Sequence, residues 1–338
     1  MTVMSAVTSN TEVQTMKAIA QTVYGGPEVM GLVEVAKPTP QETEVLVKVR
    51  SASVDAGVWH LMRGTPFLIR LIYGGLRRPK HPILGSAIAG EVEAVGADVT
   101  QFQPGDRVFG DLSESGFGGF AEYVCAPETA IAAQPTNLTA EAAAIVPVSG
   151  VSALQALRDV GQLQPGQRVL IIGAAGGVGS FAVQIAKALG AEVNGACSAH
   201  KTDQVQQLGA DRTLDYSDPA LTQPDQPYDL ILDTAAYRDF ADYLPALKPG
   251  GTYVMVGGST AAFFRAMLLG PWVGKRRDRQ VKCLAAALNQ ADLLTLKTMI
   301  EAGQVTPLCD LTYPLAQVPD AIRAIEQRQV VGKVAITL

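Results

Sequence analysis

The chain has few cysteines and histidines for its length. Its 338 residues include four cysteines and three histidines. The cysteines lie far apart and form no C-x-x-C pair, so neither a zinc knuckle nor a thioredoxin-like redox pair is expected. A disulfide framework is equally disfavoured, and the default expectation is a reducing compartment, here taken as the cytoplasm.

Long apolar runs and an excess of basic residues are also missing. No stretch of about 18 or more apolar residues occurs, which disfavours a membrane-spanning helix. The net charge of −5 argues against a nucleic-acid partner. Residues 1–15 contain one Glu and no Lys or Arg, unlike a signal or transit peptide, and are predicted to be a disordered extension.

What is present divides the chain into two patterns. Up to about residue 138, short β-rich runs at 18–23, 44–54 and 88–95 alternate with Gly- and Pro-containing turns. From residue 139 to 288, helices alternate with strands expected at 168–172, 192–197, 229–233 and 251–257. A helix is also expected at 152–160. This alternation predicts a parallel sheet with right-handed crossovers, and therefore an α/β fold.

The most specific local signal is the run Ile-Gly-Ala-Ala-Gly-Gly-Val-Gly at 172–179. It follows a strand of the buried type and opens a helix, which is the context of a dinucleotide-binding loop. Gly176 would let the backbone approach a pyrophosphate, and Gly179 would let the helix pack tightly on the strand. The helix N-terminus would face the phosphates. The predicted cofactor contacts of this loop are Ala175, Gly176, Gly177 and Val178.

The end of the second strand of this unit indicates which dinucleotide binds. An NAD site normally has Asp or Glu there, which holds the ribose 2′-hydroxyl. Residues 196–201 read Ala-Cys-Ser-Ala-His-Lys and contain no acid. Ser198 and Lys201 would instead hold a 2′-phosphate, so NADPH is predicted rather than NADH.

Further motifs carry a resemblance to a known family. They are Pro-Ile-Leu-Gly at 82–85, Ala-Gly-Glu-Val-Glu-Ala-Val-Gly at 89–96, Pro-Gly-Asp-Arg-Val-Phe-Gly at 104–110 and Gly-Lys-Val at 332–334. With the glycine loop, they make residues 16–338 resemble the medium-chain dehydrogenase/reductase superfamily. The resemblance implies a GroES-like β-barrel-type catalytic domain, residues 16–138 and 289–338, and a Rossmann domain with a doubly wound parallel sheet, residues 139–288.

Zinc-dependent members of this superfamily carry a catalytic Cys and a His-Glu pair. Here Asp55 stands at the position of the Cys, and Ser86 and Ala87 replace His-Glu. The four-cysteine structural zinc lobe is missing as well. Because a catalytic zinc site needs three protein ligands, no metal is predicted.

The missing zinc ligands narrow the expected chemistry. Oxidation of a simple alcohol needs a group that lowers the pKa of the hydroxyl, and the Tyr-x-x-x-Lys pair of metal-free enzymes is also absent. Hydride delivery to a quinone or an α,β-unsaturated carbonyl remains feasible, because such an acceptor delocalises its own negative charge. The resemblance accordingly points to the zinc-free branch of quinone oxidoreductases and alkenal or enone reductases.

Candidate catalytic residues come from the first half of the chain. Asp55 is predicted to face cofactor and substrate, with a turn residue as the alternative. Trp59 and Tyr73 are predicted to line the pocket of a flat, apolar acceptor, and Tyr73 to donate a proton or hydrogen bond; a tyrosine without chemistry is the alternative. The insertion 64–81 is read as either a lid or a solvated basic loop.

The resemblance also assigns cofactor contacts in the second half. It places Tyr216 at the 2′-phosphate. The remaining predicted contacts lie at strand ends, where ligands bind in such sheets, and in the tail motif: Thr234, Ala235, Val256, Gly257, Gly258 and Lys333.

Apolar and basic residues interleave in the segment 262–284, as they do in peptides that lie on anionic membranes. A loop over the cleft, or a subunit contact, is the alternative. The resemblance also implies a homodimer that pairs edge strands, expected at 280–287.

Together these observations predict a zinc-free, NADPH-dependent reductase of an enone or enal C=C bond. An NADPH:quinone oxidoreductase is the alternative. An NADPH-binding redox sensor or peripheral membrane component without turnover, and a zinc alcohol dehydrogenase, remain open.

Overall fold

The computed structural model describes residues 14–73, 75–327 and 329–338. Most of the predicted N-terminal extension, 1–13, therefore lies outside the described residues. The prediction for Thr15, at the end of that extension, is wrong, since Thr15 begins strand β1 (Thr15–Ala20) and pairs with Ala36. Strand β1 pairs in antiparallel fashion with β2 (Gly31–Ala36), a strand that the turn-rich sequence did not reveal.

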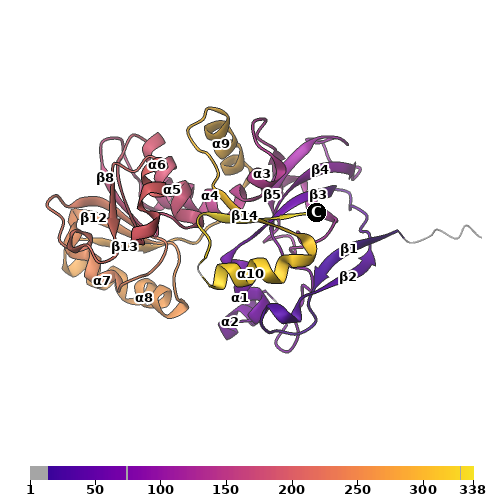
Figure 1. Cartoon of the computed structure of the whole chain (residues 1–338), viewed down its shortest axis with the longest axis horizontal. Coiled ribbons are helices and arrows are strands. Elements are labelled where there is room, and N and C mark those ends of the chain that lie inside the picture. Colours follow the sequence, from indigo (N-terminus) through magenta and orange to yellow (C-terminus); the bar gives the residue numbers. More distant parts are fainter. Residues whose placement is uncertain (1–13, 74, 328) are drawn as a thin grey trace, which may run out of the picture.

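One half of the molecule is built on a parallel sheet, which has the order β10-β9-β8-β11-β12-β13 within the described residues (Figure 1). Its strands are β8 (Arg168–Ile172), β9 (Glu192–Cys197), β10 (Arg212–Asp215), β11 (Tyr228–Asp233), β12 (Leu247–Met255) and β13 (Gln280–Cys283). The helices of this half are α4 (Val146–Gln155), α5 (Gly177–Ala188), α6 (Thr202–Gln207), α7 (Phe240–Tyr243) and α8 (Thr260–Arg276).

Alternation along β8 shows why this sheet is covered on both faces. Val169 and Ile171 belong to one apolar core, while Leu170 and Ile172 belong to another. The first core includes residues of α4 and α5, and the second includes residues of α7 and α8. A strand that is buried on both faces must be apolar throughout, as this run is.

The other half is a mixed sheet, which the described residues form in the order β14-β15-β3-β4-β5-β7, with β6 paired to β3. Its strands are β3 (Glu44–Val54), β4 (Ala87–Val95), β5 (Arg107–Asp111), β6 (Tyr123–Pro127), β7 (Ile131–Ala133), β14 (Cys309–Pro314) and β15 (Lys333–Thr337). The remaining α-helices are α1 (Ala56–Arg63), α2 (Phe67–Ile72), α3 (Ala140–Ala144), α9 (Gln290–Glu301) and α10 (Val318–Glu326). The C-terminal tail thus returns to the sheet begun by the N-terminal half, as Figure 1 shows.

Several predicted boundaries were wrong by a few residues. The strand expected at 251–257 begins earlier, at Leu247, and ends at Met255. The helix expected at 152–160 begins at Val146 and continues as a π-helical turn, Ala156–Val160. The strands at 44–54, 168–172 and 192–197 are confirmed. Apolar periodicity located the elements, but end positions depend on tertiary contacts.

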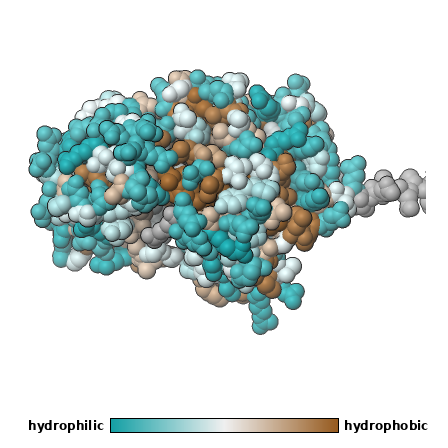
Figure 2. Space-filling model, viewed as in Figure 1, coloured by the Kyte–Doolittle hydropathy of each residue, from teal (hydrophilic) through white to brown (hydrophobic). Residues whose placement is uncertain are grey.

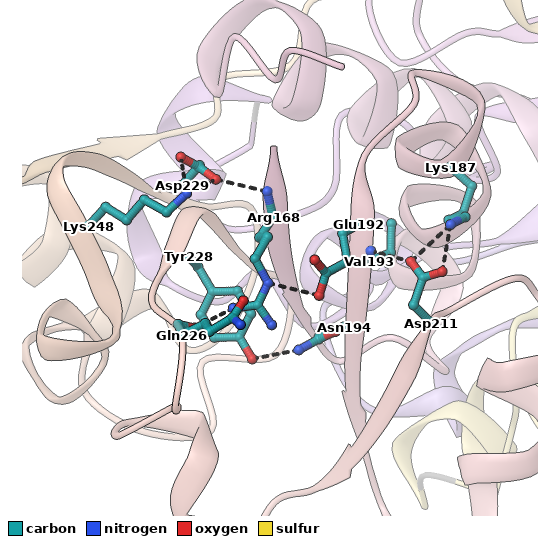
Figure 3. A network of polar contacts seen from close by, with 10 residues as sticks. All are labelled: Arg168, Lys187, Glu192, Val193, Asn194, Asp211, Gln226, Tyr228, Asp229 and Lys248. Atoms are coloured by element: carbon teal, nitrogen blue, oxygen red, sulfur yellow. Dashed lines mark hydrogen bonds and ion pairs between the residues drawn. The ribbon is translucent and has the colours of Figure 1, made fainter. Parts of the chain in front are cut away.

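A polar network fastens the parallel sheet at the amino ends of its strands (Figure 3). The Arg168 amide donates to Asp229 at 2.8 Å, and the Arg168 guanidinium donates to Glu192 at 2.8 Å. The Asn194 amide donates to the Tyr228 hydroxyl at 2.8 Å. Since the glycine loop lies at the opposite, carboxyl ends, this network stabilises the fold and leaves the ligand edge free.

On the surface, hydrophobic atoms gather along the junction of the two halves, within a mostly hydrophilic exterior (Figure 2). Among the described residues, no helix combines the length and apolar character that crossing a bilayer requires.

Candidate functional site

The glycine loop joins β8 to α5 through close backbone packing. Gly173 has a φ of +84°, which favours glycine. A Cβ on Gly179 would lie 2.1 Å from the Gly173 carbonyl oxygen and 2.8 Å from Cα of Ala174. No side chain fits there, so Gly179 lets the helix approach the strand as predicted.

The outer face of this loop suits an anion. Gly176 is the N-cap of α5, without a side-chain cap, and the first turn contains no acid. Gly176 is exposed, and a Cβ there would meet only the Gly173 carbonyl oxygen, at 3.2 Å. Because an uncapped helix N-terminus presents N–H groups and a positive dipole end, the loop fits a pyrophosphate. Ala175 is buried behind it, whereas Gly177 and Val178 are half-buried in the first turn.

The C-terminal tail is fastened to this loop. The Gly332 amide donates to the Ala175 carbonyl oxygen at 2.9 Å, just before β15 begins. Next in the tail, Cδ of Lys333 lies 2.7 Å from the position that a Cβ on Gly177 would take. The tail therefore carries Lys333 from the mixed sheet to the start of α5.

Lys333 forms a buried ion pair with Asp55. Both side chains are only 6% exposed, and Lys333 Nζ donates to Asp55 Oδ1. Nζ also lies 3.3 Å from the Val54 carbonyl oxygen, and Ser53 Oγ lies 3.4 Å from Asp55 Oδ2. Asp55 precedes α1 but makes no side-chain cap, so the turn-residue alternative does not account for its carboxylate. The sequence singled out both residues but gave no sign that they pair.

A second buried carboxyl, Asp111, stands near this pair at the end of β5. It is 4% exposed, and its Oδ1 accepts a 2.8 Å hydrogen bond from the Ser113 amide. Burial, helped by the nearby charge of Asp55, raises the pKa of Asp111 to about 6, while hydrogen bonds from Ser113 and Ser86 act in the opposite direction. Sequence analysis missed Asp111, because its only local signal was an acid after the Arg-Val-Phe-Gly strand.

Asp111 also lines a cavity of about 140 Å³. The cavity has contributions from the loop that follows β6 and from the segment at the start of α9. Its other lining residues are Glu114, Ser115, Pro127, Thr129, Ala130, Leu288, Asn289 and Leu293. A carboxyl group with a pKa near neutrality that faces a cavity is a candidate proton donor or acceptor.

The predicted 2′-phosphate residues lie at the carboxyl ends of β9 and β10. Ser198 is half-buried and makes no side-chain cap to the short helix that follows it. Lys201 Nζ donates to the Val330 carbonyl oxygen at 3.0 Å, which ties this end to the tail. One acid is also present, since Asp215 ends β10; its Oδ1 accepts hydrogen bonds from the Ser217 amide and hydroxyl.

Tyr216 follows Asp215 and belongs to an aromatic pair. Its ring stacks on Tyr237 with centroids 4.4 Å apart. The Arg238 guanidinium donates to the Tyr216 carbonyl oxygen at 3.0 Å. Within the described part of the chain, the buried Nε of Arg238 has no hydrogen-bond partner. Arg238 is therefore a cation near the predicted phosphate position that sequence analysis missed.

The loops after β11 and β12 pack on each other beside the glycine loop. Thr234 Oγ1 donates to the Ile172 carbonyl oxygen at 2.8 Å, so this side chain braces the loop. Asp233 is buried and accepts hydrogen bonds from the amides of Ala235 and Ala236 and from the Tyr253 hydroxyl. Of the predicted contacts here, Ala235 and Gly258 are exposed, while Val256 and Gly257 are half-buried.

Trp59 and Tyr73 lie on α1 and at the end of α2. The Trp59 indole N–H donates to Glu326 on α10. Tyr73 is 43% exposed and borders a cavity of about 10 Å³, room for about one water. Within the described residues, no hydrogen bond or ring contact joins either ring to the Asp55–Lys333 pair. Their predicted pocket roles stay predictions.

Comparisons with known proteins identify the family. Residues 41–136 match the alcohol dehydrogenase GroES-like domain, and residues 208–336 match a family described as zinc-binding dehydrogenase. The chain is 32% identical over 335 residues to the chloroplast envelope quinone oxidoreductase homolog of Arabidopsis thaliana, covering 95% of this chain and 98% of that protein. This chain belongs to the medium-chain dehydrogenase/reductase superfamily. It is an oxidoreductase with the two-domain fold of that superfamily.

Two further relatives within the superfamily differ in their named substrates. The 2-methylene-furan-3-one reductase of Solanum lycopersicum is 29% identical over 333 residues, covering 95% of this chain and 79% of that protein. The solved structure of the quinone oxidoreductase from Coxiella burnetii has a TM-score of 0.85 and 28% identity, covering 96% of this chain and all of that chain.

The side chains at the superfamily's metal position do not suit zinc. The Asp55 carboxylate is neutralised by the Lys333 ammonium, and Ser86 supplies only a hydroxyl. Among the described residues, no group of three or more His, Cys, Asp or Glu side chains is placed to hold a metal. Because zinc prefers thiolate, imidazole and carboxylate ligands, this donor set does not fit the ion. A metal-free enzyme stays a prediction.

Proposed function

We propose that this oxidoreductase is an NADPH-dependent reductase of activated acceptors, with the C=C bond of an α,β-unsaturated carbonyl as the preferred substrate. A quinone is the alternative acceptor, and relatives of both kinds support the proposal. The observation that carries it is the buried Asp55–Lys333 pair, which stands where zinc-dependent relatives have a metal ligand. An acceptor that delocalises its own charge needs hydrogen bonds and a proton rather than a Lewis acid.

The glycine loop and its surroundings support a nicotinamide dinucleotide. NADPH would supply the hydride when bound in the cleft between the domains. The uncapped start of α5 would hold the pyrophosphate, and the strand-end loops at 234–235 and 256–258 would hold the ribose and carboxamide. Ser198, Lys201, Tyr216 and Arg238 would surround the 2′-phosphate, and they favour NADPH over NADH.

The protein groups at the reacting end have separate roles. The Lys333 ammonium would orient Asp55 and donate a hydrogen bond toward the cleft beside Gly177. Asp111, whose pKa is raised to about 6, would hold the proton that the reduced acceptor takes up. Burial of these groups excludes water and strengthens their electrostatic effect.

The test is consumption of NADPH by purified, chelator-treated protein with an alkenone and a benzoquinone in parallel. We expect turnover of the alkenone with reduction of its C=C bond, and lower rates with NADH. Turnover of the quinone alone would move the assignment to a quinone reductase. Binding of NADPH without consumption would favour a sensor, and activity that requires zinc would contradict the proposal.

The 2′-phosphate assignment predicts a change in cofactor selectivity. Replacing Lys201 with Gln keeps a donor for the Val330 carbonyl oxygen but removes the charge. We expect the KM for NADPH to rise by about 10- to 100-fold, because a charge-assisted hydrogen bond is lost, while the KM for NADH stays within about twofold. Steady-state kinetics with both cofactors would measure this.

The matched control is Arg212→Gln. Arg212 begins β10, whereas the predicted phosphate position lies at the carboxyl end of that strand. It should change neither KM. If Lys201→Gln weakened NADPH and NADH equally, Lys201 would be holding the tail rather than a phosphate.

Strand β13 ends the parallel sheet and pairs only with β12 in the described residues, so it offers an edge for the predicted homodimer. The cytoplasmic location stays a prediction, since one of the named relatives is a chloroplast envelope protein homolog.

A further inference from the structure

Exposed apolar side chains concentrate on two helices. Of the sixteen large hydrophobic residues that are exposed in the described chain, eleven lie on α2 with its following turn or on α8. The first group is Phe67, Leu68, Leu71, Ile72, Tyr73 and Leu76. The second group is Phe264, Met267, Leu268, Leu269 and Trp272. Exposed apolar side chains that gather on a helix in this way mark an interaction site.

The same two segments are basic. Residues 64–81 contain four Lys or Arg and no Asp or Glu, and so do residues 260–277, in a chain with a net charge of −5. In the described structure, the cations without an acidic partner include Arg77, Arg78, Lys80, Lys275 and Arg276. Arg276 also lies over the Trp272 ring, 3.6 Å from its centroid. We call these two segments together the basic apolar face.

Both segments lie along the same lower border of the molecule, one in each half (Figure 1). Both segments are connected in sequence to the site. Helix α8 starts directly after the 256–258 loop, and α2 follows α1, whose N-cap residue is Asp55. The basic apolar face therefore flanks the junction of the two halves.

Charge decides which partner fits this face. A symmetric dimer through it would bring each cationic segment toward a copy of itself or of the other cationic segment, because such an interface uses the same patch on both subunits. An anionic lipid surface would instead neutralise the cations while the apolar side chains enter the region between headgroups and acyl chains. Trp and Arg suit that boundary, since each has an apolar body and a polar end.

We propose that the basic apolar face, α2 with its following turn and α8, docks this enzyme on an anionic phospholipid membrane. The contact is peripheral, and it turns the junction of the two halves toward the lipid surface. The docking surface is independent of the proposed reaction and of the choice between enone and quinone.

The test is sedimentation of the full chain with phosphatidylcholine vesicles, with or without about one-third phosphatidylserine. We expect binding only to the anionic vesicles, and a fall of more than about tenfold in the partition coefficient at high salt, because surface attraction is screened. Leu268→Glu on α8 and Leu71→Glu on α2 should each reduce the partition coefficient about tenfold.

A matched control and a local probe accompany these variants. Leu294 on α9 is 45% exposed and lies outside the face, so Leu294→Glu should bind like the unmodified chain. Trp272 is one of only two tryptophans, so anionic vesicles should shift its emission to the blue, and Trp272→Phe should lose the shift.

Sedimentation velocity without vesicles tests the other possible occupant of the face, a second copy of this chain. If the chain ignored anionic vesicles while Leu268→Glu turned a dimer into a monomer, a second copy would occupy α8 and the proposal would be wrong. Unchanged binding of both Leu→Glu variants would also overturn it. Leu268→Glu should retain activity on soluble acceptors. Failure of the docking proposal can therefore be distinguished from failure of the proposed function.

Discussion

Replacing Lys333 with methionine should lower the free energy of unfolding by about 3–5 kcal/mol, because it leaves the Asp55 carboxylate buried without its partner. Both side chains are 6% exposed, so water cannot replace the lost ammonium. Asp111 adds a second buried acid near Asp55, which makes an unpaired charge there more costly. Chemical denaturation, followed by fluorescence and circular dichroism, would measure the loss.

A double variant distinguishes the cost of the unpaired charge from the cost of altered side-chain packing. Adding Asp55→Asn to Lys333→Met removes both charges, and we expect it to recover more than half of the lost stability. Catalytic activity should not recover with it, since the ammonium beside the glycine loop is still missing. Full recovery of activity would show that the pair is purely structural.

The control is an exposed ion pair of the same kind. Arg323 and Asp320 on α10 have side chains that are 45% and 56% exposed. Arg323→Met should therefore change the free energy of unfolding by less than about 1 kcal/mol. If Lys333→Met and Arg323→Met both changed the free energy of unfolding only slightly, the buried pair would contribute no more than a surface pair.

Asp111→Asn should lower kcat/KM by about 100-fold and remove the fall in rate above about pH 6, because Asp111 is proposed to supply the proton. Burial raises the pKa of this carboxyl to about 6. The rate of the unmodified enzyme should therefore rise as the pH falls through about 6, as the donor becomes protonated. In the Asn variant the rate should be flat across that range.

The same substitution should stabilise the protein at neutral pH. The pKa of Asp111 is higher in the folded state, about 6, than its ordinary value of 3.8. Between these values the unfolded chain binds fewer protons, so stability falls as the pH rises from about 4 to 6. Asn carries no charge. Above pH 6, the free energy of unfolding of the Asp111→Asn variant should therefore exceed that of the unmodified chain by about 1–3 kcal/mol, and below pH 4 the two should be equal.

Glu114→Gln is the matched control, because Glu114 lines the same cavity but is exposed. It should keep both the pH profile and the stability of the unmodified enzyme. A gain in stability for Asp111→Asn without any loss of activity would make Asp111 a structural acid and leave the proton to solvent.

The sequence by itself determined the fold class, the superfamily and the position of the glycine loop. The run 172–179 was predictable from local sequence, because the close contact of Gly179 with Gly173 requires glycine in any such strand–loop–helix unit. The apolar strands at 168–172 and 192–197 were likewise predictable, because burial on both faces requires an unbroken apolar run.

Only the tertiary structure decided what the polar residues do. Asp55 and Lys333 are separated by 278 positions, and pairing of β15 with β3 brings them together. Asp111 joins them because β5 lies in the same sheet, where it pairs with β4. Trp59 is held by Glu326 on α10, a contact between distant segments. Sequence patterns report local periodicity and motif chemistry, whereas ion pairs, buried acids and exposed faces depend on which distant elements pack together.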